Sequence, residues 1–252
     1  MSTLALAQAE HAATAAGRVV KGQVRLEQVR LGQVRLRTYV MAFALGFPIA
    51  FYLLLLAAVV IQYGHLPNYL TPYNWISNLL RIIAGTRSVT DMVSIMLDEW
   101  LLETGYMDFD YGHGIADWSL SIIPHKLAIL ALAGALVGLN VGLLLGQRTV
   151  RSWRRQGVQA ARFGLLTGAG VVCASVTNAT VFSVVHCATP SWVGSLAVLG
   201  FDSYDVFAIE PYGPIICLFG LAALAVSAVL IARERRADVA EPMGRVPEAV
   251  PC

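Results

Sequence analysis

Charged side chains are scarce in this chain: only 13% of its 252 residues are Asp, Glu, Lys or Arg, against about 25% in soluble domains. Apolar residues make up 57%, and the mean hydropathy is +0.64. Too few polar groups remain to cover a soluble globule. This composition excludes a cytosolic enzyme, a secreted disulfide scaffold, a disordered tail protein and a nucleic-acid binder. The sequence predicts an integral membrane protein that has the lipid bilayer as a partner.

Four long stretches contain no acidic, basic or histidine residue. They are residues 38–64, 127–147, 163–185 and 211–232, with lengths of 27, 21, 23 and 22 residues. About 20 helical residues cross a hydrocarbon core that is ~30 Å thick, so each stretch is long enough to span the membrane once. The predicted fold class is therefore all-α, with four transmembrane helices.

The connecting segments alternate in charge. Residues 1–37 contain six Lys or Arg and residues 148–162 contain five Arg, whereas residues 65–117 and 187–210 contain seven and three acidic residues. Basic residues near helix ends stay in the cytoplasm. We therefore expect a multi-pass protein of the cell (inner) membrane, with both termini cytoplasmic and both acidic loops outside.

The predicted chain thus has nine segments in order. They are a basic amino-terminal segment (1–37), the first span (38–64), an outer loop (65–117), the second span (118–147), an Arg-rich loop (148–162), the third span (163–186), an outer or re-entrant loop (187–210), the fourth span (211–232) and a cytoplasmic tail (233–252).

Within the first segment, residues 23–37 hold three tandem copies of Gln-Val-Arg-Leu-X. Five helical steps turn the face by about 140°, so the period fits neither a helix nor a strand. The segment either lies on anionic lipid headgroups or is a weakly structured tail.

The first outer loop is too long to be structureless in a compact domain. Ser88, with Asp91 three residues later, predicts a helix start. Apolar residues then recur at helical spacing, at Val89, Met92, Val93, Met96, Trp100 and Leu101. Gly105 offers a stop. We expect an amphipathic helix that lies on the outer membrane surface or caps the bundle.

Glycine recurs at every fourth position of the second predicted span, at Gly134, Gly138, Gly142 and Gly146. Small residues at this spacing share a helix face and let helices approach closely in lipid. Gly164 and Gly168 repeat the spacing in the third predicted span. We expect these two spans to form a tight hairpin, and we expect glycine-rich faces to bind other membrane subunits or further copies of the chain.

Side chains able to bind metal gather on the outer side of this topology. Imidazole, thiolate and carboxylate are the common protein ligands of divalent transition metals. The candidates are His113, His125, His186, Cys187, Asp110 and Asp117. The alternative is a scatter of unrelated polar residues, because acidic outer loops also follow from the retention of basic residues inside.

The first cluster is Asp110-x2-His113-x3-Asp117-x7-His125. It loosely resembles the Asp-x3-His-x12-His copper ligands in the C subunit of particulate methane and ammonia monooxygenases, with both spacings one residue shorter here. The second ligand set of that family has no counterpart after Asn178. The resemblance covers less than a tenth of the chain and implies a copper-dependent membrane assembly.

The second cluster joins His186-Cys187-Ala-Thr-Pro190, after a gap of 19 residues, to Glu210-Pro-Tyr-Gly-Pro-Ile215 and an apolar span that ends in Arg. Residues 164–236 thereby resemble the helical hairpin of bacterial mercuric-ion transport membrane proteins, where Cys-Cys, two residues and Pro precede Glu-Pro-Tyr-x-Pro-Ile. The resemblance implies that Cys187 stands at the second metal-accepting cysteine and that His186 replaces the first. No cytoplasmic Cys pair follows to receive an ion.

Two functions follow from these patterns. The first is a membrane protein that handles a transition-metal ion (copper, zinc or mercury) at its outer face, by transport or metal acceptance. The second is a non-catalytic subunit of a larger membrane complex, such as a copper-dependent monooxygenase assembly. The sequence contains no phosphate-binding loop, nucleophile elbow or Cys-x2-Cys motif. These absences favour a chain that is not an enzyme on its own, and the sequence leaves the question open.

Overall fold

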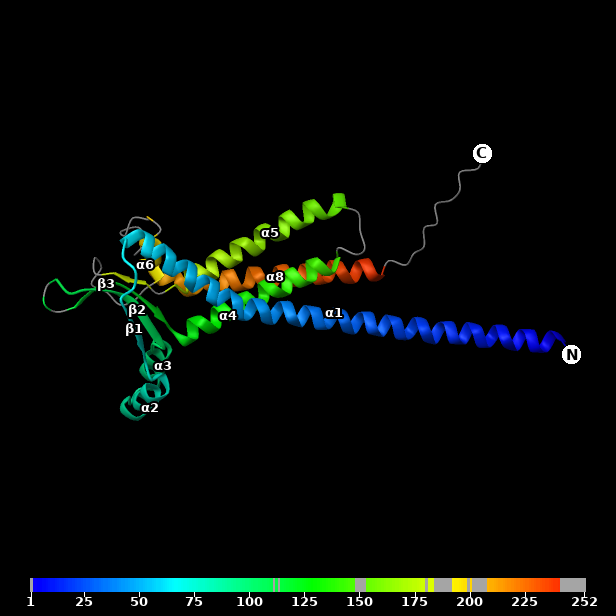
Figure 1. Cartoon of the computed structure of the whole chain (residues 1–252), viewed down its shortest axis with the longest axis horizontal. Coiled ribbons are helices and arrows are strands. Elements are labelled where there is room, and N and C mark those ends of the chain that lie inside the picture. Colours follow the sequence, from blue (N-terminus) through cyan, green and yellow to red (C-terminus); the bar gives the residue numbers. More distant parts are fainter. Residues whose placement is uncertain are drawn as a thin grey trace.

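The computed structural model describes residues 2–110, 112, 114–147, 153–179, 181–183, 192–198, 200 and 208–240. Long helices run roughly along one axis, and a small β-sheet lies at one end of them (Figure 1). The elements are α1 (Ser2–Tyr63), β1 (Tyr69–Pro72), α2 (Trp75–Gly85), α3 (Val89–Leu97), β2 (Leu102–Asp108), β3 (Ile115–Ile122), α4 (Pro124–Gln147), α5 (Trp153–Val176), β4 (Val181–Ser183), α6 (Trp192–Val198), η1 (Glu210–Tyr212) and α8 (Gly213–Ala240). We call the sheet together with α2 and α3 the head.

Three helical segments among the described residues are long and apolar enough to cross a membrane. They are Gln33–Tyr63 of α1, Pro124–Leu145 of α4, and Glu210–Glu234, which joins η1 to most of α8. They coincide with the first, second and fourth predicted spans over most of their length. The prediction of a membrane protein with transmembrane helices is supported at this level.

The third predicted span, 163–186, is not one helix. Its apolar helical part ends at Val176. Thr177 and Asn178 donate side-chain hydrogen bonds back to carbonyl groups of the last turn, over 2.9 and 2.6 Å. Such bonds offer the backbone an alternative to a further helical turn, so the uncharged sequence continues into β4 instead.

The four strands form one antiparallel sheet in the order β1-β2-β3-β4. β2 and β3 form its central hairpin, in which Leu102 lies opposite Ile122. Gly112 in the connecting turn has a φ of +81°, a conformation that glycine adopts without a steric penalty. The all-α class is therefore wrong for the head, although the chain is mostly helical. Residues 118–122, assigned from the sequence to the second span, belong to β3.

Inside the outer loop, the predicted helix is present but shorter than expected. The backbone N–H of Asp91 donates to Ser88 Oγ over 3.4 Å, which confirms the helix start. The helix ends at Leu97, and Gly105 lies within β2 rather than at a helix end. The three residues before Gly105, Leu102 to Thr104, pair with β1 and β3, so sheet formation overrides the helical spacing.

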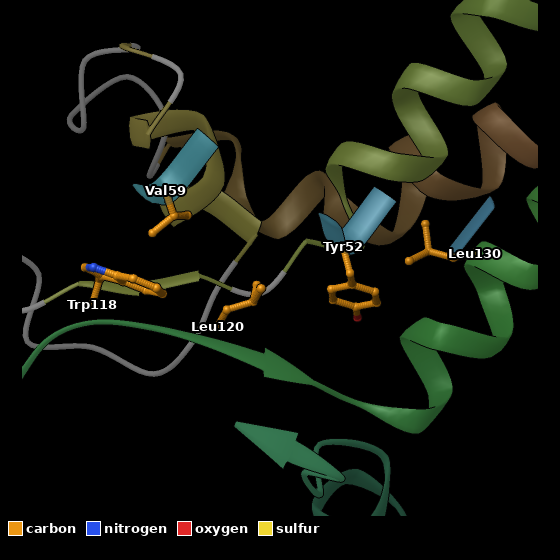
Figure 2. Close-up of a cluster of buried hydrophobic side chains, with 5 residues drawn as sticks. All are labelled: Tyr52, Val59, Trp118, Leu120 and Leu130. Carbon is orange, nitrogen blue, oxygen red and sulfur yellow. The ribbon is translucent and has the colours of Figure 1, made fainter. Parts of the chain in front are cut away.

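The sheet is held to the helices by a buried apolar cluster (Figure 2). Tyr52 and Val59 come from α1, Trp118 and Leu120 from β3, and Leu130 from α4. Trp118, Val59 and Leu130 are completely buried. This cluster attaches the head to the carboxyl-terminal end of α1 and to the beginning of α4.

The glycine face of α4 packs against α1. Its glycines Gly134, Gly138 and Gly142 each approach atoms of α1. A Cβ atom on Gly138 would lie 2.6 Å from the carbonyl oxygen of Tyr39, so only glycine permits this helix contact. The expectation that these glycines face the third span is wrong. Gly164 and Gly168 have no described atom within 4 Å of where a Cβ would stand.

Helices α5 and α8 pack together through a different pair of glycines. A Cβ on Gly170 would lie 2.8 Å from the carbonyl oxygen of Gly220. One or two turns away, the hydroxyl groups of Thr167 and Ser227 form a hydrogen bond of 3.0 Å. Interhelical contacts of this kind are typical of helices in lipid, where close packing and polar bonds replace the hydrophobic effect.

Candidate functional site

A carboxylate in the head accepts hydrogen bonds from two tyrosines. Glu103 lies on β2, and its Oε1 and Oε2 accept from the hydroxyl groups of Tyr69 at 2.9 Å and Tyr73 at 2.6 Å. A Cβ on Gly105 would lie 2.8 Å from the Tyr69 hydroxyl, so this glycine leaves the space that the tyrosine occupies. We call Glu103, Tyr69 and Tyr73 the Glu103 cluster.

Both tyrosines of the Glu103 cluster hold their protons strongly. Burial, and then the hydrogen bond and negative charge of Glu103, raise the pKa of Tyr69 well above its ordinary value. The same causes raise the pKa of Tyr73 to about 12. The phenols therefore stay neutral donors at physiological pH, and they are poor proton sources. The cluster is therefore structural: its hydrogen bonds join β2 to β1 and to the residues that lead into α2.

Alkaline pH should loosen the Glu103 cluster. The folded pKa of Tyr73 lies above its ordinary value of 10.0, so its contribution to stability is complete below pH ~10 and is lost as the pH rises through the folded pKa. We expect the near-ultraviolet circular dichroism of the protein to change as the pH rises from the ordinary pKa of Tyr73, 10.0, to its folded pKa of about 12. In Glu103→Gln the charge is absent, so the change should begin at lower pH. An identical pH profile for both proteins would contradict this assignment.

Further contacts tie α2 and α3 to the sheet. The side-chain amide of Asn78 donates to Glu99 Oε1 over 2.5 Å. The rings of Tyr73 and Trp100 meet edge to face, with centroids 5.8 Å apart. Glu99 and Glu103, two of the seven acidic residues of the predicted outer loop, thus help to hold the head together.

His125 is placed at the junction of the head and α4. Its Nδ1 meets the carbonyl oxygen of Leu97 at the end of α3. Because a carbonyl only accepts, Nδ1 carries the proton in this contact. The ring therefore joins α3 to the first turn of α4 and keeps Nε2 for another partner.

Asp110 and Asp117, the two carboxylates predicted to bind metal, both belong to the β2–β3 hairpin, whereas His125 lies in the first turn of α4. Asp110 is exposed in the turn, where its backbone N–H donates to Asp108 Oδ1 over 2.9 Å. Asp117 lies on β3 next to an irregularity in the pairing of β2 with β3. Within the described ranges, no three His, Cys, Asp or Glu side chains are close enough to hold one metal ion. His113, His186 and Cys187 lie outside the described residues.

Of the polar residues near the end of α5, Asn178 bonds to a neighbouring helix, which is usual for polar groups in a membrane span, whereas Thr177 bonds back to carbonyl groups of α5 itself. The amide of Asn178 donates to Cys217 Sγ on α8 over 3.3 Å. Both side chains are buried. The pair lies just beyond the end of α5 and in the second turn of α8, not midway along either helix.

Sequence reasoning missed the Glu103 cluster. From the sequence alone, Tyr69 and Tyr73 are interpreted as membrane-interface anchors, because they are aromatic and follow a predicted span, and Glu103 is one of seven acidic residues in its loop. The one usable signal is Gly105, which has no side chain and so leaves room on β2 for a large residue of a neighbouring strand. In the structure that residue is Tyr69, which lies opposite Gly105 in the pairing of β1 with β2. Recognising it requires the strand register, which the sequence leaves open.

Comparison with known proteins adds no family assignment. No protein-family model, no curated protein and no solved structure matches this chain. Conclusions about its site therefore depend on its own residues. These residues support a membrane protein with three helices able to cross a bilayer and with a β-sheet head at one end of the bundle.

Proposed function

We propose that this chain is a non-catalytic subunit of a larger membrane complex. The observation that carries the proposal is the amino-terminal part of α1. This helix has 62 residues, but its apolar span begins only at Gln33. The preceding residues continue the same helix past the ends of α4 and α8 (Figure 1). The interpretation of the repeat as a weakly structured tail is thus wrong, because residues 23–37 are helical.

A helix of this length is rarely stable without a partner. Residues 2–32 extend about 45 Å at 1.5 Å per residue, and most helix stability in proteins comes from tertiary packing. Among the described elements, α1 packs with α4, α6 and β3. Among the α4 glycines whose surroundings are described, Gly142 lies nearest the end of the helix, and it approaches Leu36 of α1. The amino-terminal part of α1 therefore needs a surface beyond those that the described part of the chain supplies.

The partner surface should be acidic and cytoplasmic. Residues 2–32 contain four basic residues, Arg18, Lys21, Arg25 and Arg30, against two acidic ones. Lipid headgroups fit less well, because the helix continues in the direction of the span (Figure 1). Its charges soon lie beyond the Debye length of about 8 Å from the membrane. An acidic segment of another subunit fits both the position and the charge.

The proposed topology places the head outside and both termini in the cytoplasm, in the inner membrane. Its support is the excess of Lys and Arg in residues 1–37 and 148–162. A fourth crossing would use α5, whose apolar part Gly164–Val176 is short. The two small helices of the head would then lie at the outer surface.

Removing residues 2–22 should release the chain from its complex without unfolding it. We expect the full chain, extracted in mild detergent from its own membranes, to form a particle of fixed composition larger than the 27.1 kDa chain. Native mass spectrometry measures this particle and should find the truncated chain alone. The thermal transition should be unchanged, because the removed residues lie beyond the helix contacts within the chain.

Two double variants, one that removes two positive charges and one that keeps them, test whether the charges of the amino-terminal helix, and not only its length, bind the partner. Arg25→Gln with Arg30→Gln should weaken the complex, whereas Arg25→Lys with Arg30→Lys should keep it. A full chain that is monomeric after extraction, or a complex unaffected by truncation, would refute the proposal. Metal content of the same particle tests the metal prediction: a fixed stoichiometry that is lost in His186→Ala with Cys187→Ala would support metal handling instead.

A further inference from the structure

A two-helix arm stands out from the side of the head. It consists of α2 and α3, and Figure 1 shows it lying beside the bundle axis rather than along it. Neither helix has a buried residue. We call residues 75–97 the arm. An element this apolar and this exposed needs an apolar environment from outside the chain.

Each helix of the arm exposes one apolar stripe. On α2, Ile76, Leu80 and Ile83 are spaced by four and three residues and are 67%, 63% and 49% exposed. On α3, Val89 and Val93 continue the pattern and are 70% and 46% exposed. Residues at these spacings share a helix face, so the exposed apolar side chains of each helix form a continuous stripe.

The level of the arm relative to the membrane is set by its contact with α4. Leu97, the last residue of α3, accepts a hydrogen bond from His125. His125 is the second residue of the apolar segment Pro124–Leu145, which is long enough to cross a membrane. The arm is thus attached where that segment begins, and if α4 crosses the membrane this end lies at the boundary between water and hydrocarbon.

We infer that the arm binds the lipid surface, with the stripes of α2 and α3 inserted at the boundary of headgroups and acyl chains. Amphipathic helices bind lipid in this way. Charge complementarity to lipid phosphate groups supports a phospholipid surface: Arg81 and Arg87 are the only two Lys or Arg residues in 65–117, both belong to the arm, and they outnumber its one acidic residue, Asp91. A protein partner at this position would have to displace the lipid that surrounds the bundle. This inference goes beyond the proposed complex and does not depend on it.

Depth-dependent quenching tests the inference on the full chain. A single cysteine is introduced at Leu80 or Val93, or at the exposed neighbour Ser94 as the matched control, in a chain whose four native cysteines are replaced by alanine. Each is labelled with an environment-sensitive fluorophore and reconstituted in phosphatidylcholine vesicles. We expect blue-shifted emission at Leu80 and Val93, and several-fold stronger quenching there than at Ser94 by phosphatidylcholine with a nitroxide near the carbonyl end of its acyl chain.

Two outcomes would overturn the inference. Water-like emission without quenching at all three positions would place the arm in solvent. Blue-shifted emission that the nitroxide lipid does not quench would show that a protein, or a second copy of the chain, covers the stripes.

A second variant keeps the test decisive if the cysteine-free chain does not fold. With the native cysteines in place, trypsin should cleave after Arg81 and Arg87 several-fold faster in Leu80→Asp with Val93→Asp than in the unaltered chain in vesicles. Equal cleavage rates would overturn the inference as well.

Discussion

Leucine in place of Gly138 should sharply lower the thermal stability of the protein in detergent. A Cβ at this position would lie 2.6 Å from the carbonyl oxygen of Tyr39 and 3.0 Å from the Cα of Val40. These are backbone atoms, which cannot turn aside as a side chain does, so α1 and α4 must separate. Overpacking costs typically about 1–3 kcal/mol and occasionally more, and a backbone clash belongs at the upper end. Scanning fluorimetry measures the loss.

Gly168→Leu is the matched control for this substitution. It adds the same side chain at another glycine of a long helix, but no described atom lies within 4 Å of its Cβ position. Its thermal transition should stay close to that of the unaltered protein. Equal losses for Gly138→Leu and Gly168→Leu would show that the α1–α4 contact is not specific.

Alanine in place of Trp118 should detach the head from the helices. The ring projects from β3, is completely buried against α1, and lies beside Val59 and Leu120 (Figure 2). Replacement of a buried Trp by Ala costs about 3–5 kcal/mol. We expect amide hydrogen exchange to accelerate across β2 and β3 while α4 and α8 stay protected, because the lost contacts lie at the head end.

Phenylalanine at position 118 distinguishes the packing of the ring from its polar atom. The indole Nε1 of Trp118 is buried without a hydrogen-bond partner among the described residues, and an unpaired buried donor is unfavourable. Trp118→Phe removes this donor and keeps most of the apolar ring. It should therefore destabilise the head much less than Trp118→Ala. Equal losses would mean that the Nε1 group has a stabilising role.

Local sequence patterns predicted those features that depend on a single segment. Charge-free stretches predicted four transmembrane helices, because a helix satisfies its own backbone in lipid, and three of these stretches coincide with described helices long enough to cross a membrane. Ser88 predicted the start of α3, because an N-cap bonds to a residue only three positions away. These predictions needed no knowledge of what packs against what.

The sheet depended on partners that are distant in the chain. β4 pairs with β3, with Ser183 opposite Trp118, across the whole of α4 and α5. Strand pairing is non-local, and a short apolar run does not by itself distinguish a strand from a helix. For this reason 163–186 was predicted as one helix, whereas the structure ends α5 at Val176 and uses residues 181–183 in the sheet.

The candidate sites show the same division. The sequence alone determined which residue types could bind metal or bring helices close, including Asp110, Asp117 and His125. Only the tertiary structure decided their neighbours: the α4 glycines face α1, His125 contacts Leu97, and Glu103 binds two tyrosines. The physical reason is that a side chain's chemistry is intrinsic, whereas its partner is set by how distant segments pack.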